Sequence, residues 1–404
     1  MRIKDIADIN QKVLSENTPK NFMFRYIDIS SVDSNGNISE SEPLYFGDAP
    51  SRARRVLRVN DIIISTVRTY LKAIAFISPN YKDYIASTGF AVLTPKKDVN
   101  PNYIYYGLIN NDFIDEVSKN SIGVSYPAIT SSELSSLSVP LPSLPVQRRI
   151  VSYLDSKTSE IDHAISLLEQ KREAYTRLKA SVINRAVTRG LNPNVKIKDS
   201  GVEWIGKIPE GWEVKRLKSI FTESKAVSST GKEDLLSVSE YYGVAKRVDK
   251  MEDGEYISRA ETLVGYKKCK KDDLVINIML AWKRGLGFSD YDGIVSPSYA
   301  VYRGKNIVPH YFHYLLRTNM YIAEFKRNSK GIIDSRLRLY TDRFNNIKAV
   351  VPPLPEQRSI ASYLDAECSK IDRAASIVEK QIDAYKRLKR SLINEVVTGK
   401  RTKF

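Results

Sequence analysis

The feature that most constrains this chain is a long internal repeat. When the 404-residue sequence is shifted by 210 residues, Pro142–Thr188 aligns with Pro352–Thr398, and 26 of the 47 positions are identical without a gap. Self-similarity on this scale indicates that one structural unit is used twice. A match without gaps is typical of a regular element rather than of a loop. The fold must therefore accommodate two copies of that element.

Apolar side chains recur at every seventh residue of each copy, which keeps one seam of a helix facing a partner, as in a coiled coil. The positions are Leu154, Ile161, Leu168, Tyr175 and Val182 in the first copy, and Leu364, Ile371, Val378, Tyr385 and Leu392 in the second. Pro145 and Pro355 suit a first helical turn, and Gly190 and Gly399 suit a helix end. We predict two long helices that pair with each other; the alternative is that each packs on its own domain.

Weaker similarities precede each helix. They align Arg2–Ile6 with Glu213–Leu217, Asn60–Ile64 with Asp272–Ile276, and Pro101–Tyr106 with Pro309–Tyr314. Short β-rich runs alternate with helical stretches in these regions, which predicts an α+β fold with two mixed α/β domains. The predicted order is a first variable domain (1–144), a first long helix (145–190), a linker (191–212), a second variable domain (213–354) and a second long helix (355–404).

The net charge of +16, from 63 Lys and Arg against 47 Asp and Glu, indicates a polyanionic partner, most often nucleic acid. The excess is uneven: residues 1–144 carry 15 basic and 15 acidic side chains, residues 191–354 are net +8, and each long helix is net +4. The two cysteines, Cys269 and Cys368, are too few for a disulfide framework, so we expect a reducing, cytoplasmic location. No apolar run is long enough to predict a membrane span.

The sequence offers little support for catalysis. Ser229–Glu233 superficially resembles a phosphate loop but lacks the required first glycine and the Ser or Thr after Lys232. His310 and His313 stand three residues apart without a Cys or carboxylate cluster, so a packed pair is favoured over a metal site. No Asn/Asp-Pro-Pro-Tyr/Phe run of an amino-methyltransferase is present. We therefore predict no catalytic residues and no metal.

Together, these features carry a family resemblance. The motif Pro-Leu-Pro-x-Gln-Arg-x-Ile occurs at the start of the second long helix, within 352–360. It recurs at the start of the first, within 142–150, with Ser in place of the first Pro. The segment that joins the two halves, 199–217, reads Asp-Ser-Gly-Val-Glu-Trp-Ile-Gly-Lys-Ile-Pro-Glu-Gly-Trp-Glu-Val-Lys-Arg-Leu. In these motifs the chain resembles the specificity subunit of a type I restriction–modification system over essentially its whole length. The variable domains match that family only in outline.

The resemblance implies a division of labour. Each variable domain would be a target-recognition domain that reads one half of a split double-stranded DNA site, and the two helices would pack antiparallel as a ruler between them. Two modification subunits, which carry S-adenosylmethionine and methylate adenine, would dock on the repeats, and restriction subunits would complete the complex. The chain itself would direct methylation or restriction without catalysing either, and it would bind no cofactor. Because the two domains differ in sequence, the bipartite target should be asymmetric.

Clusters of basic and aromatic residues suggest where DNA is bound, since arginine serves both phosphate contact and guanine recognition whereas lysine favours phosphate. The candidates are Arg52, Arg54, Arg55, Arg68, Tyr70, Lys72, Ser125 and Tyr126 in the first domain, and Lys267, Lys268, Lys283, Arg284, Arg336, Arg338 and Tyr340 in the second. Ser125, Tyr126 and the 336–340 residues follow an Asn-Ser-x-Gly that both domains share. For each cluster the alternative is an ordinary solvated surface.

Two other functions remain open at the level of sequence. One is a stand-alone DNA-binding regulatory protein that dimerises through a coiled-coil rod, and the other is an enzyme with unrecognised chemistry. A stable complex with a methyltransferase subunit would distinguish the specificity subunit from both.

Overall fold

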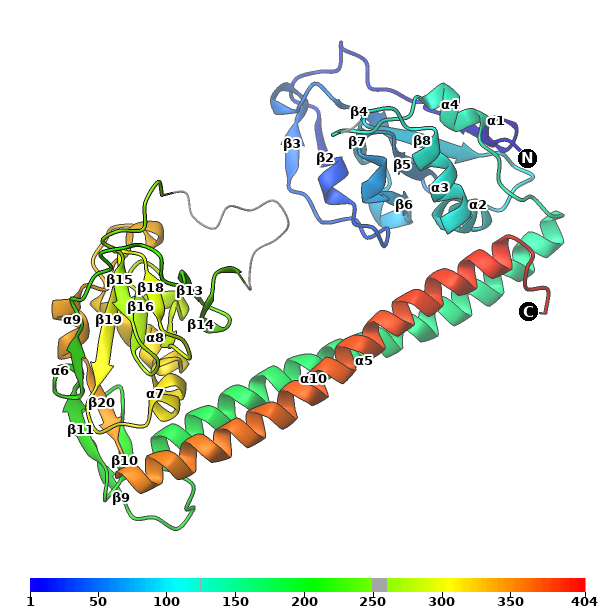
Figure 1. Cartoon of the computed structure of the whole chain (residues 1–404). Coiled ribbons are helices and arrows are strands. Elements are labelled where there is room, and N and C mark those ends of the chain that lie inside the picture. Colours follow the sequence, from blue (N-terminus) through cyan, green and yellow to red (C-terminus); the bar gives the residue numbers. More distant parts are fainter. Residues whose placement is uncertain (124, 249–259, 404) are drawn as a thin grey trace. The chain divides into compact units, whose positions relative to one another are not determined.

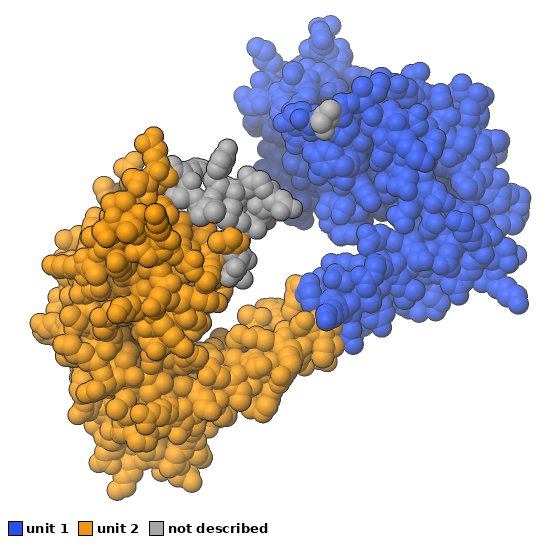
Figure 2. All heavy atoms as spheres, viewed as in Figure 1, with its two compact units in different colours: residues 1–169, 379–404 blue, residues 170–378 orange. Residues whose placement is uncertain are grey.

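The computed structural model describes residues 1–123, 125–248 and 260–403 and separates into two compact units (Figure 1). Unit 1 comprises residues 1–169 and 379–404, and unit 2 comprises residues 170–378, coloured blue and orange in Figure 2. Each unit thus contains one variable domain together with parts of both long helices. The boundaries predicted from sequence fall at the helix ends, whereas the packing divides the chain within the helices.

Unit 1 contains two four-stranded sheets. One has the strand order β1-β8-β5-β6 with antiparallel neighbours, and the other has the order β3-β2-β7-β4, in which only β2 and β7 are parallel. The strands are β1 (Ala7–Ile9), β2 (Met23–Ile27), β3 (Pro43–Tyr45), β4 (Ala53–Val56), β5 (Ile62–Ser65), β6 (Ile74–Phe76), β7 (Ile85–Ser87) and β8 (Phe90–Pro95). The helices are α1 (Ile3–Ile6), α2 (Pro101–Ile109), α3 (Asn111–Lys119) and α4 (Ser131–Ser136).

Unit 2 repeats this plan around a four-stranded sheet of order β12-β19-β16-β17, with four two-stranded sheets, β9-β10, β11-β20, β13-β14 and β15-β18. The strands are β9 (Ile197–Asp199), β10 (Lys207–Pro209), β11 (Glu213–Arg216), β12 (Phe221–Glu223), β13 (Leu236–Ser239), β14 (Gly243–Lys246), β15 (Lys267–Cys269), β16 (Leu274–Asn277), β17 (Leu286–Phe288), β18 (Gly293–Val295), β19 (Tyr299–Gly304) and β20 (Lys348–Val351). The helices are α6 (Leu217–Ile220), α7 (Pro309–Leu316), α8 (Asn319–Asn328) and α9 (Thr341–Asn346).

The two long helices are α5 (Leu144–Arg189) and α10 (Leu354–Val397), and they pack together, which confirms the predicted fold class. In unit 1, Lys389 near the end of α10 forms an ion pair with Asp162 in the first half of α5. In unit 2, Lys179 in the second half of α5 pairs with Asp372 in the first half of α10. As residue number rises along one helix it falls along the other, so the pairing is antiparallel.

The predicted seam residues are buried or half-buried, with Tyr385 as the exception at 37% exposed. Ile382 is fully buried instead, and it belongs to a second set of apolar positions lying between those at the seven-residue spacing. A coiled coil buries two positions in each heptad, conventionally called a and d. The strict spacing of seven identified only one of the two sets.

A buried glutamine explains the repeated motif before each helix. Gln147 donates through Nε2 to the carbonyl of Pro142 at 2.8 Å and accepts the backbone N–H of Asn100 at 2.9 Å. Gln357 makes the equivalent bonds to the carbonyl of Pro352 at 2.8 Å and the N–H of Val308 at 2.9 Å. Each glutamine thus fastens the start of its long helix to the loop before α2 or α7.

The prediction of a linker at 191–212 is wrong for most of its length. β9 and β10 pair as a hairpin within this stretch, and Ile208 is fully buried while Trp212 is 1% exposed. The charged side chains of this stretch are exposed, as they would be in a linker, but the segment is ordered and its Pro209 is buried in β10. Its tryptophan and isoleucine side chains join the unit 2 core.

The alignment of Arg2–Ile6 with Glu213–Leu217 is also wrong, by three residues. α1 corresponds to α6, because each is a four-residue helix followed directly by an edge strand of the central sheet, β1 or β12. The backbone pairing agrees: Arg2 forms a β-bridge with Ser138, and Arg216 pairs in the same way with Lys348 in the β11–β20 sheet. The alternating basic and apolar residues of both segments permit either register in sequence.

Among the described residues, no helix is both long and apolar enough to cross a membrane.

Candidate nucleic-acid interface

In unit 1, a 3₁₀ turn and a loop from distant parts of the sequence lie side by side. The turn, η3 (Thr69–Leu71), connects β5 to β6, and the loop runs from Ser121 to Ile129 between α3 and α4. Val67 and Ile122 each bridge Ala128, and the N–H of Ile129 donates to the carbonyl of Thr66 at 2.8 Å. This backbone pairing brings two of the predicted DNA-binding clusters together.

The guanidinium of Arg68 lies over the ring of Tyr126, 4.7 Å from its centroid. Both side chains are exposed, and so are Tyr70, Lys72 and Ser125. Arg68 and Lys72 flank η3 with positive φ angles of 52° and 53°, a conformation that non-glycine residues seldom adopt. The turn therefore presents its cationic and aromatic side chains outward on an unusual backbone. Val124, in the same loop, lies outside the described residues.

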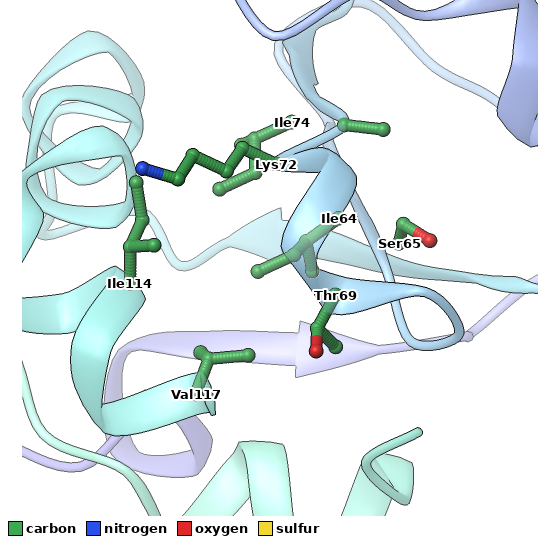
Figure 3. A pocket seen from close by; sticks show the side chains of 8 residues that line it. Ile64, Ser65, Thr69, Lys72, Ile74, Ile114 and Val117 are labelled. Atoms are coloured by element: carbon green, nitrogen blue, oxygen red, sulfur yellow. The ribbon is translucent and has the colours of Figure 1, made fainter. Parts of the chain in front are cut away.

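A small cavity of about 10 Å³ lies beneath this turn. Figure 3 shows Lys72 extending over the cavity toward the side that Ile114 lines, with Thr69 on the opposite side. Thr69 Oγ1 is 3.0 Å from Ser121 Oγ, so the turn is hydrogen-bonded to the first residue of the loop. The apolar walls of the cavity and this bond hold the turn in position.

The predicted arginines in β4 and directly before it differ in their surroundings. The carbonyl of exposed Arg52 accepts a hydrogen bond from the N–H of Thr88. The next residue, Gly89, accepts one from the N–H of Thr66, which directly precedes the segment leading to η3. Arg52 therefore lies near the η3 turn. Arg54 and Arg55 lie further along β4: Arg54 stacks over Phe46 at 4.9 Å, and desolvation lowers the pKa of half-buried Arg55. Packing of this kind is typical of a structural side chain, so Arg52, which directly precedes β4, is the arginine of this cluster best placed beside Arg68 and Tyr126.

The equivalent turn in unit 2 is η6 (Ala281–Lys283). Lys283 Nζ lies 5.0 Å from the Trp282 ring centroid, and Lys326 Nζ lies at the same distance from it. Arg284, with φ 63°, donates through Nη2 to Asn319 and through Nε to the carbonyl of Arg317 at 3.2 Å. The guanidinium of Arg284 is thus partly committed to the protein, whereas Lys283 remains exposed.

Arg317 holds this turn against a second loop. Its guanidinium donates to the carbonyls of Arg284 and Leu286 at 2.8 and 2.6 Å, and to those of Glu240 and Tyr241 at 2.7 and 3.3 Å. Burial and the nearby charge of Arg284 lower the pKa of Arg317 to about 10. Sequence reasoning missed this residue, because a lone arginine in a helical stretch gives no sign that it binds four backbone carbonyls.

The unit 2 loop that corresponds to 121–129 forms a tight hairpin. Lys330 and Arg338 exchange two backbone hydrogen bonds at 2.9 Å, and Leu339, 1% exposed, anchors the hairpin through its N–H to the carbonyl of Ile278. Gly331 has φ 148°, and a Cβ there would lie 2.6 Å from the carbonyl oxygen of Arg336, so glycine is required. Figure 1 shows this segment between α8 and α9.

The hairpin presents the predicted residues differently. Arg336 is exposed, and Tyr340 is 46% exposed. Arg338 is half-buried, and its Nη1 donates to the carbonyl of Leu337 at 2.9 Å, so it braces the hairpin. Ile332 is 100% exposed and Ile333 is 53% exposed, as Ile122 is 76% exposed in unit 1. These apolar side chains were missed, although their position beside the shared Asn-Ser-x-Gly could have identified them.

Lys267 and Lys268 lie on β15, the counterpart of β4. Lys267 Nζ donates to the carbonyl of Tyr299 at 2.6 Å, and Lys268 Nζ lies 3.5 Å from Glu233 Oε1. Both are therefore engaged with neighbouring residues.

In the part of the chain that the structure describes, no group of three His, Cys, Asp or Glu side chains is arranged to hold a metal ion.

Comparisons with known proteins agree with this geometry. The family model for the type I restriction modification DNA specificity domain matches residues 1–171 and 209–382, one match for each half. The putative type I restriction enzyme MjaX specificity subunit of Methanocaldococcus jannaschii is 24% identical and aligns over 98% of this chain and 92% of its own length. The type I restriction enzyme EcoBI specificity subunit of Escherichia coli is 23% identical, over 75% of this chain and 66% of its own.

Two solved structures share the fold. A chain of a type I R-M system, solved in work on complex assembly and conformational transition, superposes with a TM-score of 0.74 at 20% identity and covers 98% of this chain and 96% of its own. The HsdS subunit from Thermoanaerobacter tengcongensis gives a TM-score of 0.51 at 22% identity, over 99% and 96%. With both halves matched by the family model, this chain belongs to the family of type I restriction–modification DNA specificity subunits, whose role is DNA recognition.

Proposed function

We propose that this protein recognises an asymmetric, bipartite DNA target, with each unit reading one half. The main support is that the two units present equivalent surfaces with different side chains. Unit 1 offers Arg68 stacked on Tyr126, whereas unit 2 offers Lys283 beside Trp282 and a hairpin carrying Arg336. A shared frame with divergent side chains is what two half-sites of different sequence require.

We further propose that the chain itself is not catalytic. It would direct adenine methylation, or restriction, by partner subunits, and two modification subunits would supply both the methyltransferase chemistry and S-adenosylmethionine. The repeat supports this stoichiometry, because Gln147 and Gln357 fasten the two helix starts in the same way, so the chain carries two copies of one structural element. Restriction subunits would join the same assembly, in the cytoplasm, where the genome is accessible.

Reconstitution with a modification subunit of a type I system tests the proposal. DNA should acquire methyladenine only when both proteins are present, and sequencing of methylated sites should show one split motif with unlike halves. Methylation by either protein alone, or a single continuous motif, would contradict the division of labour. A chain with Arg68→Ala and Tyr126→Ala should lose recognition of the half-site read by unit 1 and retain recognition of the other.

A further inference from the structure

Ile332 stands at the tip of the unit 2 hairpin with its side chain 100% exposed, and the neighbouring Ile333 is 53% exposed. Among the described residues, no other large apolar side chain is as exposed as that of Ile332. Apolar surface in water is unfavourable, and covering it is favourable. The side chain of Ile332 therefore adds nothing to the core of unit 2 and is available to another molecule.

The backbone holds this tip in a defined place. Lys330 and Arg338 exchange two hydrogen bonds at 2.9 Å. The N–H of Arg336 donates to the carbonyl of Ile333 at 2.8 Å, and Gly331 turns the chain directly before the tip with φ 148°. A contact that is already ordered in the free protein loses little conformational entropy on binding. The tip is thus preformed for contact.

The hairpin and the η6 turn form one surface. The N–H of Leu339 donates at 2.9 Å to the carbonyl of Ile278, which lies between β16 and η6. Lys326 links the two as well, because its Nζ lies 3.0 Å from Asp334 Oδ2 of the hairpin and 5.0 Å from the ring centroid of Trp282. The apolar tip therefore belongs to the unit 2 part of the candidate nucleic-acid interface.

The charges around the tip favour a polyanion over an apolar groove of a protein. Residues 330–338 contain three basic side chains and one carboxylate, that of Asp334, which is paired with Lys326. Lys330 and Arg336, on either side of the tip, are exposed. In a DNA duplex the apolar surface lies between stacked base pairs, where inserted side chains such as Ile, Leu and Phe reach it, and cations contact the phosphates outside. An apolar tip between cations has the composition that this contact requires.

We propose that Ile332 inserts as a wedge between two adjacent base pairs of the half-site that unit 2 reads, unstacks them and bends the duplex there. This inference rests on the proposed recognition of DNA by unit 2. Lys330 lies against the phosphates beside that step. Because pyrimidine–purine steps unstack most easily, this half-site should contain one at the point of insertion. Ile332 thus contributes to specificity without a hydrogen bond to any base.

The test uses the complex reconstituted with a modification subunit, bound to a duplex that carries its methylated split motif. Dyes at the duplex ends report bending by energy transfer. 2-Aminopurine, whose fluorescence rises when it loses a stacking neighbour, replaces in turn the purines of both half-sites other than the methylated adenines. We expect binding to raise this fluorescence at least threefold at one step of one half-site. Ile332→Ala should reduce the rise to less than 1.5-fold and decrease the bend, and Ile332→Phe should retain both. Ile197→Ala, at an exposed position on β9, should change neither.

A mismatch at the unstacked step separates insertion from a contact on the outside of the duplex. The mismatch should raise the affinity of the unaltered complex at least threefold, because only a wedge gains from a step that is already weakened. It should leave the affinity of the Ile332→Ala complex unchanged. Equal gains for both complexes would overturn the proposal. Circular dichroism confirms the folding of each variant.

The remaining outcomes distinguish the wedge from the proposed function. If the unaltered complex methylates its split target without unstacking any base beyond the methylated adenines, the wedge is wrong and the proposed function stands. If the complex binds no split target selectively, both are wrong. Sedimentation without DNA tests the other possible occupant, a protein: if Ile332→Ala prevents assembly with the modification subunit, the tip is a protein contact and the wedge is wrong.

Discussion

Lys179 Nζ lies 2.7 Å from Asp372 Oδ2, and the 210-residue repeat converts this pair into a second one, in which Lys389 Nζ lies 2.7 Å from Asp162 Oδ2. Each lysine thus belongs to one helix in one unit, and its equivalent belongs to the other helix in the other unit. This reciprocal exchange is what a local two-fold relation between two copies of one helix produces. The ion pairs therefore specify the register of an antiparallel pairing.

Charge reversal tests that register. Lys179→Asp places two carboxylates together and should lower the free energy of unfolding at low salt, while Lys179→Asp combined with Asp372→Lys should recover most of the loss. Because the side chains are 36% and 59% exposed, we expect a coupling of only about 0.2–1 kcal/mol. Urea unfolding at low salt and at about 1 M salt measures it, since high salt screens exposed charges. A double variant no better than the single one would contradict the pairing.

The glutamine that fastens each helix start should matter more than these exposed pairs. Gln357→Leu removes the donor to the carbonyl of Pro352 and the acceptor of the Val308 N–H, leaving one buried and one partly buried backbone group without these partners. Each unsatisfied group costs about 1–3 kcal/mol. Thermal unfolding followed by calorimetry should show a lower transition for unit 2, while Gln170→Ala, at an exposed position on α5, should leave it unchanged. If Gln357→Leu lowered the transition temperature no more than the control does, the hydrogen bonds of Gln357 would not be needed for the stability of unit 2.

The half-buried His313 predicts a pH dependence of unit 2. Burial, together with the charges of Arg317 and His310, lowers the pKa of His313 to about 3. An unfolded histidine titrates near 6.5, so between about pH 6.5 and 3 the unfolded state binds the extra proton. The stability that this neutral histidine contributes is therefore complete above pH 6.5 and is lost as the pH falls toward 3, at no more than about 1.4 kcal/mol per pH unit.

Urea unfolding between pH 7 and 4.5 measures this slope. His313→Phe keeps an aromatic ring against β14 but removes the titration, so the stability of the variant should fall less steeply with decreasing pH. His163→Gln, at an exposed position on α5, should retain the slope of the unaltered protein. An unchanged slope in His313→Phe would assign the acid sensitivity to other groups.

The hairpin of unit 2 carries one exposed arginine, Arg336, and one arginine, Arg338, that supports the hairpin itself. Arg336 is exposed, and its replacement by alanine should cost about 1–3 kcal/mol of affinity, and only for DNA that retains the half-site read by unit 2. Arg338→Ala should instead loosen the hairpin, because its guanidinium binds the carbonyl of Leu337. Arg343→Ala, on α9, is the matched control. Binding to DNA with each half-site scrambled in turn distinguishes these effects, and a uniform loss for Arg336→Ala would reassign it to phosphate contact.

The repeat made much of this architecture predictable, because its pattern of apolar residues depends only on local helix geometry. Composition also indicated that β-rich runs alternate with helical stretches in the variable domains, but it did not show that one such stretch forms two helices, α7 and α8. The β9–β10 hairpin was not predictable: its turn-forming composition is the same whether a segment is free or packed, and only the tertiary contacts of Ile208 and Trp212 decide between the two.

The candidate site was predictable in part for a similar reason. Clusters of cations can be read from sequence, but whether a guanidinium faces solvent or binds the protein depends on partners far along the chain. Arg68 meets Tyr126 across 58 residues, and Arg284 is engaged by Asn319 and Arg317. Exposed isoleucines such as Ile332 carry no charge signal at all. The roles of these residues in DNA binding stay predictions.

Helix length, rather than the segment after α5, should determine which bipartite target is recognised. An insertion of four residues between Pro193 and Asn194, in an exposed turn before β9, should leave the target spacing nearly unchanged, because neither helix nor the β9–β10 hairpin is altered. An insertion of seven residues within α5 adds about 10 Å of helix and displaces every following seam residue. It should alter or abolish recognition of the split target. Methylation of DNA libraries with varied spacers, by the complex reconstituted with each variant, measures the preferred spacing. Equal sensitivity to both insertions would count against a helical ruler.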